Sequence, residues 1–243
     1  MSFEIPFTKD NLDFYLKELV KESKKQARGM DAELILIGGA SVLINYGFRE
    51  MTYDIDAVIA APSVMKDAIN TVGDRHNLPN GWLNADFKNT ISYSPKLARY
   101  SEYYRTYANV LQIRTVRAEY LVAMKLVSGR KYKKDLSDIV GVLYEQQRAG
   151  NPLAYELIDK AMNDLYGGWD HVSDYAKDLL NIALKSEHLD KLFVELSEDE
   201  ATAKAALLEM DKKYPNVVNK DNVNDIIAIA MAKKKKREDR EER

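Results

Sequence analysis

The strongest constraint on the fold is an apolar run that ends in two glycines. Residues Leu34 to Ile37 are all apolar, as in a strand buried on both faces, and they lead directly into Gly38 and Gly39. Glycine lets the backbone turn sharply and lets a ligand come close to the backbone amides. We expect a short helix over residues 40–45 after this turn. Its first amides are unpaired donors at the positive end of the helix, which suits a phosphate group.

A pair of acidic residues follows in the segment Asp54-Ile55-Asp56. In an extended strand residues two apart face the same way, so both carboxylates project from one face. They repel each other, and no Lys or Arg stands between them to relieve this. A divalent cation would balance the charge. Mg²⁺, or Mn²⁺ in its place, is the expected ion, because Mg²⁺ binds one or two carboxylates together with phosphate oxygens.

The five residues Gly38, Gly39, Ser41, Asp54 and Asp56, in this order, resemble the pattern of the nucleotidyltransferase superfamily. That pattern is a Gly-Gly or Gly-Ser turn, a short helix and a strand carrying Asp-x-Asp. The longer sequence around these five residues most resembles the AbiEii-type and related toxin-like nucleotidyltransferases of bacterial defence and toxin–antitoxin loci. The resemblance implies an α/β (α+β) fold: a nucleotidyltransferase-like core with a small mixed sheet flanked by helices, followed by an all-helical C-terminal region.

Two residues between the glycines and the acidic pair are further candidates. Arg49 and Thr52 either contact phosphate or stabilise the loop, and both roles stay open. The next expected strand, over residues 109–115, contains no carboxylate, whereas many members of the superfamily carry a third one there. This departure argues against an ordinary centre of three aspartates.

A second motif lies further along the chain. Residues 119–128 have the pattern of a mostly apolar helix in which Lys125 is the only interior cation, and a second helix is expected to begin near Lys133. Asp135 and Asp138 border the apolar face of that second helix. The motif, formed by Lys125, Arg130, Lys134, Asp135, Asp138 and Ile139, resembles downstream motifs of the AbiEii-type group.

That resemblance implies that Lys125 holds the triphosphate and that an aspartate completes the active site, Asp135 before Asp138. Other interpretations stay open from the residues alone. Lys125 could extend along the surface towards water, as lysines commonly do. The two aspartates could instead pair with Arg130, Lys131 or Lys134 on their own helix, as exposed charges commonly do.

Tyrosines recur in the segment before residue 109. They are Tyr100, Tyr103, Tyr104 and Tyr107. Such rings can stack on bases, but the spacing suits a packed edge or helix face equally well. We favour packing.

Composition excludes several classes of protein. The chain of 243 residues has a formal net charge of -2, so nothing attracts nucleic acid globally. It has no Cys, which excludes disulfides, thiolate zinc sites and a cysteine nucleophile. No apolar run approaches a membrane span, and a start that includes Glu4 and Asp10 is unlike a signal peptide. We expect a cytoplasmic protein that does not contact a membrane.

We expect a nucleotidyltransferase-like catalytic domain over residues 1–147 and a helical C-terminal region with a charged tail over residues 148–243. Helices are expected over residues 152–165, 173–185, 189–196 and 198–212, with a last one from Asp221. The run Lys233 to Lys236 is followed by acidic residues, which favours a solvated helix end over an RNA-binding tail.

The predicted activity is a Mg²⁺-dependent transfer of a nucleoside monophosphate from an NTP to an acceptor hydroxyl. In this prediction Gly38, Gly39 and Ser41 hold phosphates, and Asp54 and Asp56 hold the metal. By the resemblance, Lys125 neutralises the leaving pyrophosphate and Asp135 completes the site. The resemblance also implies a tRNA end or other RNA as the acceptor, with a protein side chain second, and a toxin of this type would have a cognate antitoxin.

Two other classes of function stay open. One is a catalytically silent module with the same fold that binds nucleotide or another protein. The other is a small-molecule nucleotidyltransferase of the antibiotic-modifying sort, which needs an acid-lined acceptor pocket that the sequence does not reveal.

Overall fold

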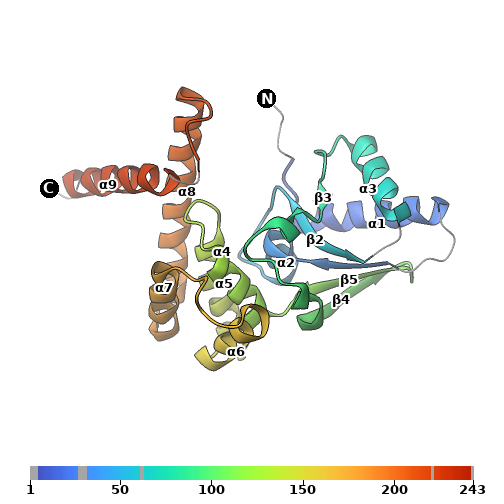
Figure 1. The fold of residues 1–243 in the computed structure, drawn as a ribbon, viewed down its shortest axis with the longest axis horizontal. Coiled ribbons are helices and arrows are strands. Elements are labelled where there is room, and N and C mark those ends of the chain that lie inside the picture. Colours follow the sequence, from blue (N-terminus) through green and yellow to red (C-terminus); the bar gives the residue numbers. More distant parts are fainter. Residues whose placement is uncertain (1–4, 27–31, 61–62, 220–221, 242–243) are drawn as a thin grey trace. The chain divides into compact units, whose positions relative to one another are not determined.

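The computed structural model describes residues 5–26, 32–60, 63–219 and 222–241 (Figure 1). Grouped by their contacts, the elements form two compact units. The first comprises residues 1–124 and 153–169, and the second comprises residues 125–152 and 170–243. The expected division of the sequence near residue 147 stays a prediction.

The first unit is built on a mixed sheet. Its strands are β1 (Ala32–Leu36), β2 (Ile55–Ala60), β3 (Leu83–Asn84), β4 (Ser101–Tyr107) and β5 (Leu111–Val116). They lie in the order β3-β2-β1-β5-β4, with β1 antiparallel to β2 and parallel to β5. Leu34, Ile35 and Leu36 of β1 are buried, which accounts for the unbroken apolar run. The predicted fold class is confirmed.

Helices cover this sheet and extend the unit. They are α1 (Lys9–Gln26), α2 (Gly38–Asn45), α3 (Ser63–His76), the start of α4 (Ala118–Ser128) and α6 (Tyr155–Tyr166), with 3₁₀ turns η1 (Asp86–Asn89) and η2 (Pro95–Tyr100). α1 and α3 lie side by side (Figure 1). Leu16 of α1 and Val72 of α3 share one hydrophobic core with Leu34 and Leu36 of β1. The core therefore fixes β1, and β1 fixes where the paired glycines begin.

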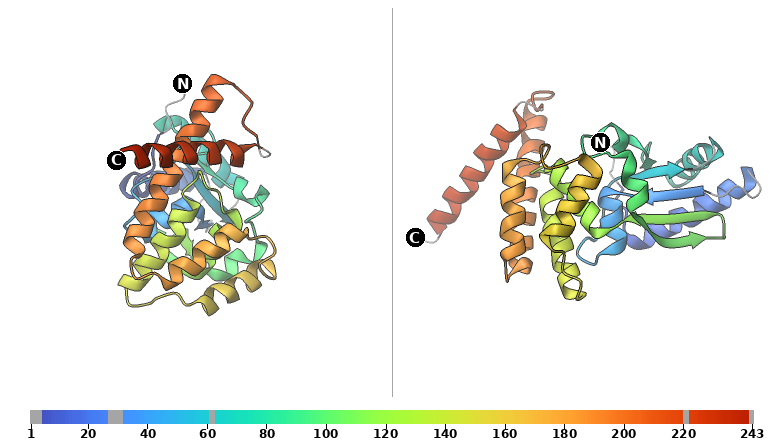
Figure 2. Two further views of the ribbon diagram at one scale, coloured as in Figure 1. Left: turned by 90° about the vertical axis from the view of Figure 1, so that its left-hand side faces the viewer. Right: turned by 60° about the horizontal axis from the view of Figure 1, so that its bottom comes forward.

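The second unit is helical. It contains the end of α4 with α5 (Asp135–Arg148), α7 (Asp174–Lys185), α8 (Leu189–Lys213) and α9 (Val223–Glu241). α8 packs against both α5 and α9, and α9 crosses α8 in the left view of Figure 2. Our expectation of two helices over 189–196 and 198–212 is wrong. Leu196, Glu200, Ala203 and Leu207 form one buried stripe at helical spacing, so a single helix continues through Ser197.

The tyrosine segment begins at the end of the 3₁₀ turn η2, with Tyr100, and continues as the edge strand β4. Tyr107 is buried, and the ring of Tyr100 stacks on Tyr120 with centroids 4.0 Å apart, whereas Tyr103 is exposed. The expected packing role is thus confirmed for Tyr100 and Tyr107.

Some expectations fall outside the described residues. Glu4, the expected helix start at Asp221 and the side chains from Lys234 onward are among them; α9 is described from Val223. Among the helices that the structure describes, none is both long and apolar enough to cross a bilayer.

Candidate active site

The paired glycines form the first turn of α2. Ile37, in extended conformation, precedes the helix and provides no side-chain cap. Gly38 has a φ of 53°, in the left-handed region that favours glycine. The helix begins at Gly38, two residues before the expected start at residue 40. Because the first amides of a helix have no partner within it, this turn presents donors suited to an anion.

Arg49 and Thr52 crowd the second glycine. A Cβ built on Gly39 would lie 2.6 Å from Thr52 Oγ1 and 2.9 Å from Arg49 Nη2, which is too close for either contact. The Nε of Arg49 donates to the carbonyl of Met51 at 3.2 Å. A guanidinium and a hydroxyl group therefore lie against a bare backbone at the start of a helix. From the sequence, Arg49 and Thr52 could either contact phosphate or stabilise the loop, and the structure places both at this turn.

Ser41 lies in the same first turn with an unsatisfied hydroxyl. Its side chain is fully buried, and its Oγ has no hydrogen-bond partner among the residues that the structure describes, although its backbone N–H donates to the carbonyl of Ile37 at 3.2 Å. A buried hydroxyl without a partner costs free energy, because it has lost its bonds to water. An orphaned polar atom beside open amides is the arrangement expected where a ligand oxygen completes the bonding.

The two predicted metal-binding aspartates lie at the start of β2. Asp54 is exposed and directly precedes the strand, and Asp56 is its second residue. The backbone carbonyl of Asp56 accepts from the N–H of Ile37 at 3.0 Å, and a Cβ built on Gly38 would lie 3.7 Å from Asp56 Oδ2. The carboxylate of Asp56 is therefore next to the first glycine of α2.

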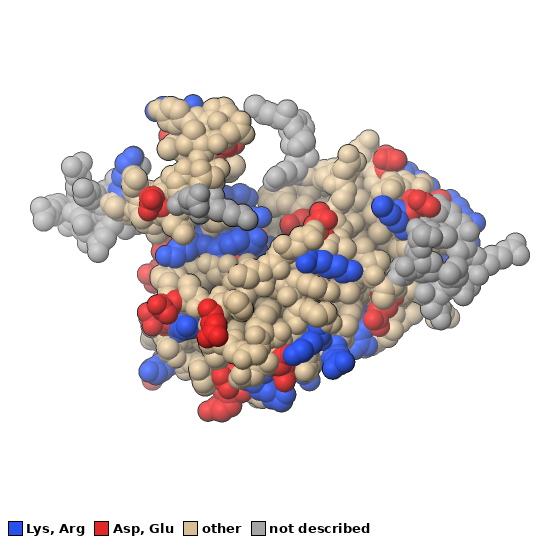
Figure 3. All heavy atoms as spheres, in the orientation of Figure 1, with Lys and Arg blue, Asp and Glu red and all other residues tan. Residues whose placement is uncertain are grey.

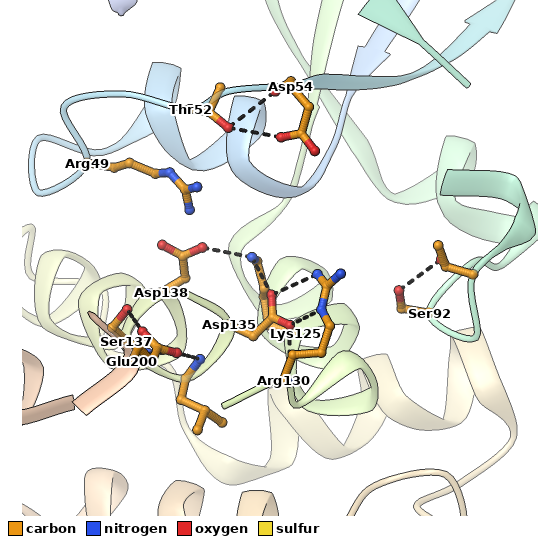
Figure 4. Close-up of polar contacts among 12 residues, drawn as sticks. Arg49, Thr52, Asp54, Ser92, Lys125, Arg130, Asp135, Ser137, Asp138 and Glu200 are labelled. Carbon is orange, nitrogen blue, oxygen red and sulfur yellow. Dashed lines mark hydrogen bonds and ion pairs between the residues drawn. The ribbon is translucent and has the colours of Figure 1, made fainter. Parts of the chain in front are cut away.

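Thr52 connects the glycine turn to Asp54. Its hydroxyl lies 3.2 Å from both Oδ1 and the backbone carbonyl of Asp54, to which it donates (Figure 4). Its backbone is held in turn by Phe7, through an N–H to carbonyl bond of 2.7 Å in one direction and 2.9 Å in the other. Phe7 is itself buried in the core. The loop that carries Arg49 and Thr52 is thus anchored to the N-terminal segment.

No third carboxylate joins this pair among the described residues. The part of the chain that the structure describes contains no group of three or more His, Cys, Asp or Glu placed to hold a metal ion. On β5 the side chain of Arg114 instead donates to Ser101, with its Nε 2.8 Å from Oγ. Two carboxylates still suit Mg²⁺, because that ion commonly completes its shell with water and substrate phosphate.

A separate charged centre is buried in the second unit. Lys125, from the last turn of α4, lies 2.8 Å from Asp135 Oδ1 and 2.8 Å from Asp138 Oδ2, both on the first turn of α5 (Figure 4). The exposed fraction is 8% for Lys125, 0% for Asp135 and 2% for Asp138. The interpretation of Lys125 as a surface residue is therefore wrong. The pattern of the helix could not show that Lys125 is buried, because it does not reveal which other residues cover this side chain.

Arg130 is the second cation of this charged centre. Its Nε lies 2.8 Å from Asp135 Oδ2, and its backbone N–H also donates to that oxygen at 3.2 Å. Burial opposes the ionisation of Asp135, but Lys125 and Arg130 outweigh it and hold the pKa of Asp135 below its ordinary value. The aspartates do pair with basic residues, but these do not belong to their own helix as expected. Arg130, which precedes α5, pairs with Asp135, and Lys125 of α4 is an unexpected partner for both.

The segment between α4 and α5 is basic on its outer side. Lys131, Lys133 and Lys134 are exposed, and Lys131 Nζ lies 4.0 Å from the centroid of the Tyr175 ring. Lys and Arg side chains gather in the region of this segment in Figure 3. The second unit therefore carries a local positive surface despite the negative net charge of the chain.

Glu200 on α8 is a buried acid that sequence reasoning missed. Its Oε1 accepts from the backbone N–H of Leu136 at 2.8 Å and from that of Ser137 at 3.4 Å, and its Oε2 accepts from the Ser137 hydroxyl (Figure 4). Burial raises the pKa of Glu200 to about 7; the bonds from Ser137 and Leu136 oppose the shift, and the charge of Asp138 adds to it. No local pattern links Glu200 to α5, since 63 residues separate it from Ser137.

A mixed sheet whose central strand leads into paired glycines, beside a strand with one aspartate directly before it and one within it, is typical of the nucleotidyltransferase class. Over residues 14–165 the chain matches DUF6036, nucleotidyltransferases of unknown function, and it belongs to that family. No curated protein and no solved structure matches the chain. The matched span includes every predicted site residue and ends before Glu200.

Proposed function

We propose that this protein transfers a nucleoside monophosphate from an NTP to an acceptor hydroxyl. The family supports an NTP as substrate. One observation carries the proposal: the carboxylate of Asp56 lies next to Gly38, at a helix start where Ser41 keeps an unpartnered hydroxyl. A bond forms between the acceptor oxygen and the α-phosphorus, the bond from the α-phosphorus to the oxygen of the β-phosphate breaks, pyrophosphate leaves with the electron pair, and the hydroxyl proton passes to water.

The residues of the first turn of α2 bind the phosphates in this proposal. The amides of Gly38 and Gly39 donate to the β- and γ-phosphates, and the hydroxyl of Ser41 finds there the acceptor that it lacks. Arg49 adds positive charge over Gly39. Gly39 must be glycine for this arrangement, because a side chain would displace both Arg49 and Thr52.

Asp54 and Asp56 are the proposed ligands for Mg²⁺ or Mn²⁺. The bond from Thr52 to Asp54 holds one carboxylate in place, and the bond from Ile37 to the backbone of Asp56 fixes the strand that carries the other. Bound there, a divalent ion supplies charge neutralisation at the α-phosphate and makes the acceptor hydroxyl more acidic.

The roles of Lys125 and Asp135 come from the motif resemblance. Lys125 neutralises the pyrophosphate as it leaves, and Asp135 completes the polar site. Two carboxylates 2.8 Å from its Nζ restrict the position of Lys125. Asp138 and Asp135 together hold the Lys125 ammonium group in place.

The acceptor in this proposal is RNA, and a tRNA end is the first candidate. A protein side chain is the second choice of acceptor. The exposed lysines between α4 and α5 support a polyanionic acceptor, because they provide a local positive surface. The resemblance of the motifs to AbiEii-type proteins supports a role as a toxin whose activity a cognate antitoxin inhibits. Growth arrest on expression that requires Asp54 and Asp56 would test the toxin role.

The activity is tested with the purified full chain, Mg²⁺, each α-labelled NTP in turn and total tRNA. Asp54→Ala/Asp56→Ala is the inactive variant, and Asp67→Ala, which changes an exposed acid on α3, is the matched control. Label on RNA, or on the protein itself, that the double variant loses and the control keeps is the expected result. Transfer that persists in the double variant would refute the assigned roles.

A catalytically silent nucleotide-binding module is the second candidate. The lack of a third carboxylate near the pair, among the described residues, favours it. Nucleotide binding that depends on Mg²⁺ and on Asp56, without transfer to any acceptor, would establish this function instead. Loss of both binding and transfer would exclude both candidates.

A further inference from the structure

The first turn of α5 depends on a residue from another helix. Lys134 stands at the N-cap position of α5 and makes no side-chain cap hydrogen bond. Asp135 follows it but directs its carboxylate to Lys125 and Arg130. The amides of Leu136 and Ser137 therefore take their acceptor from Glu200. Helix starts usually find this acceptor in their own N-cap side chain, so a buried acid from α8 is an unusual replacement.

The same turn carries the charged centre of the second unit. Asp135 and Asp138 flank the two residues that Glu200 binds, and both hold Lys125 Nζ at 2.8 Å. A shift of this turn would move both carboxylates together and would change where the ammonium group lies. Glu200 is 4% exposed and bonds through both carboxyl oxygens, so its own position is well defined.

We propose that Glu200 is a positioning residue for the charged centre: its carboxyl group caps α5 and thereby sets where Asp135 and Asp138 hold Lys125. That this matters for transfer rests on the proposed function. The cap needs an acceptor oxygen and a group that bonds the Ser137 hydroxyl, and Gln provides both. The capping role therefore depends on the shape and bonding of the side chain, and a neutral amide can replace it.

The proposal is tested in the full chain with Glu200→Ala and Glu200→Gln. Glu198→Ala, which removes an exposed acid two residues earlier on the same helix, is the matched control. The first measurement is hydrogen exchange of the Leu136 and Ser137 amides. Glu200→Ala should speed their exchange on the order of tenfold relative to the wild type, because a lost cap opens the first turn, while amides in the middle of α5 change little. Glu200→Gln and Glu198→Ala should leave this exchange unchanged.

The second measurement is steady-state transfer at a temperature where every variant is folded. Glu200→Ala should lower kcat about tenfold or more with little change in the KM for NTP, because Lys125 acts as the pyrophosphate leaves. Glu200→Gln should restore kcat. A purely structural role would lower only the melting temperature and leave kcat per folded molecule intact.

The outcomes separate this inference from the proposed function. Wild-type protein without transfer activity would refute the proposed function, and the exchange measurement would still decide the cap. Unchanged exchange at Leu136 and Ser137 in Glu200→Ala would overturn the inference, and so would an unchanged kcat in an active enzyme. Equal loss in Glu200→Ala and Glu200→Gln would also overturn it, since it would assign the effect to charge.

Discussion

The guanidinium of Arg49 lies against Gly39, with Nη2 2.9 Å from the place where a Cβ would be. Gly39→Ala should therefore displace Arg49 and Thr52 from the first turn of α2. We expect the free energy of unfolding to fall by about 1–3 kcal/mol, as for other overpacked sites. Nucleotide affinity should fall on the order of a hundredfold, because displaced site groups no longer match the ligand.

Urea unfolding and equilibrium binding of an NTP measure these two effects. Gly47→Ala is the matched control, since a Cβ at Gly47 would meet nothing within 4 Å. Binding by Gly39→Ala equal to that of the control would contradict the placement of phosphate at this turn.

Ser41→Ala separates ligand binding from stability. Removing a buried hydroxyl that has no partner should leave the free protein as stable as the wild type or more stable by about 1 kcal/mol. Nucleotide affinity should nevertheless fall by about threefold to tenfold, the effect of one lost hydrogen bond. Thermal unfolding with and without NTP tests both effects. A variant that is clearly less stable without nucleotide would show that Ser41 has a structural partner after all.

Lys125→Met should destabilise the second unit strongly. It removes the cation that lies 2.8 Å from buried Asp138 and one of the two cations that pair with Asp135. Breaking a buried ion pair by removing one partner typically costs about 3–5 kcal/mol. Urea unfolding measures the loss, with exposed Lys185→Met on α7 as the control. Adding Asp138→Asn to Lys125→Met should recover part of the loss, and no recovery would show that the two residues act independently.

Glu200 should make stability depend on pH near neutrality. Its pKa is raised from 4.5 to about 7 in the folded protein, chiefly by burial. The folded state thus holds a proton that the unfolded state has released between these values. The stability associated with that proton is fully present below pH 4.5 and is lost as the pH rises through about 7.

Glu200→Gln removes this titration, so its stability relative to the wild type should rise between pH 5 and pH 7.5 by on the order of 1–3 kcal/mol. Urea unfolding at each pH checks this. A difference between variant and wild type that stays constant over the range would mean that Glu200 keeps an ordinary pKa.

Local sequence patterns predicted the elements that carry the phosphate and metal candidates. The apolar run of β1 and the alternation around Ile55 are determined by burial within a few residues, so the sequence reveals them. The strand β4 was missed because it is an edge strand whose middle residues, including Tyr103 and Arg105, face away from the core. The strand β3, Leu83–Asn84, is too short to show a period.

Long-range contacts were beyond the sequence. The spacing of Asp135 and Asp138 predicted their place at the border of the apolar face, but it could not show that Lys125 pairs with both. Glu200 gave no local signal, because its partners lie on another helix. Its place in the buried stripe of α8 was typical of an apolar residue, and only the open amides of α5 explain an acid there.

The capping of α5 by α8 imposes an order in time. Leu136 leaves the ribosome 64 residues before the carboxylate that completes its helix, a delay of roughly 3 to 13 s at typical rates of synthesis. A nascent chain can therefore form the sheet, with its glycine turn and aspartate pair, while the first turn of α5 still lacks its acceptor. A chain that ends before Glu200 would contain every strand of the sheet described here and an unfinished charged centre.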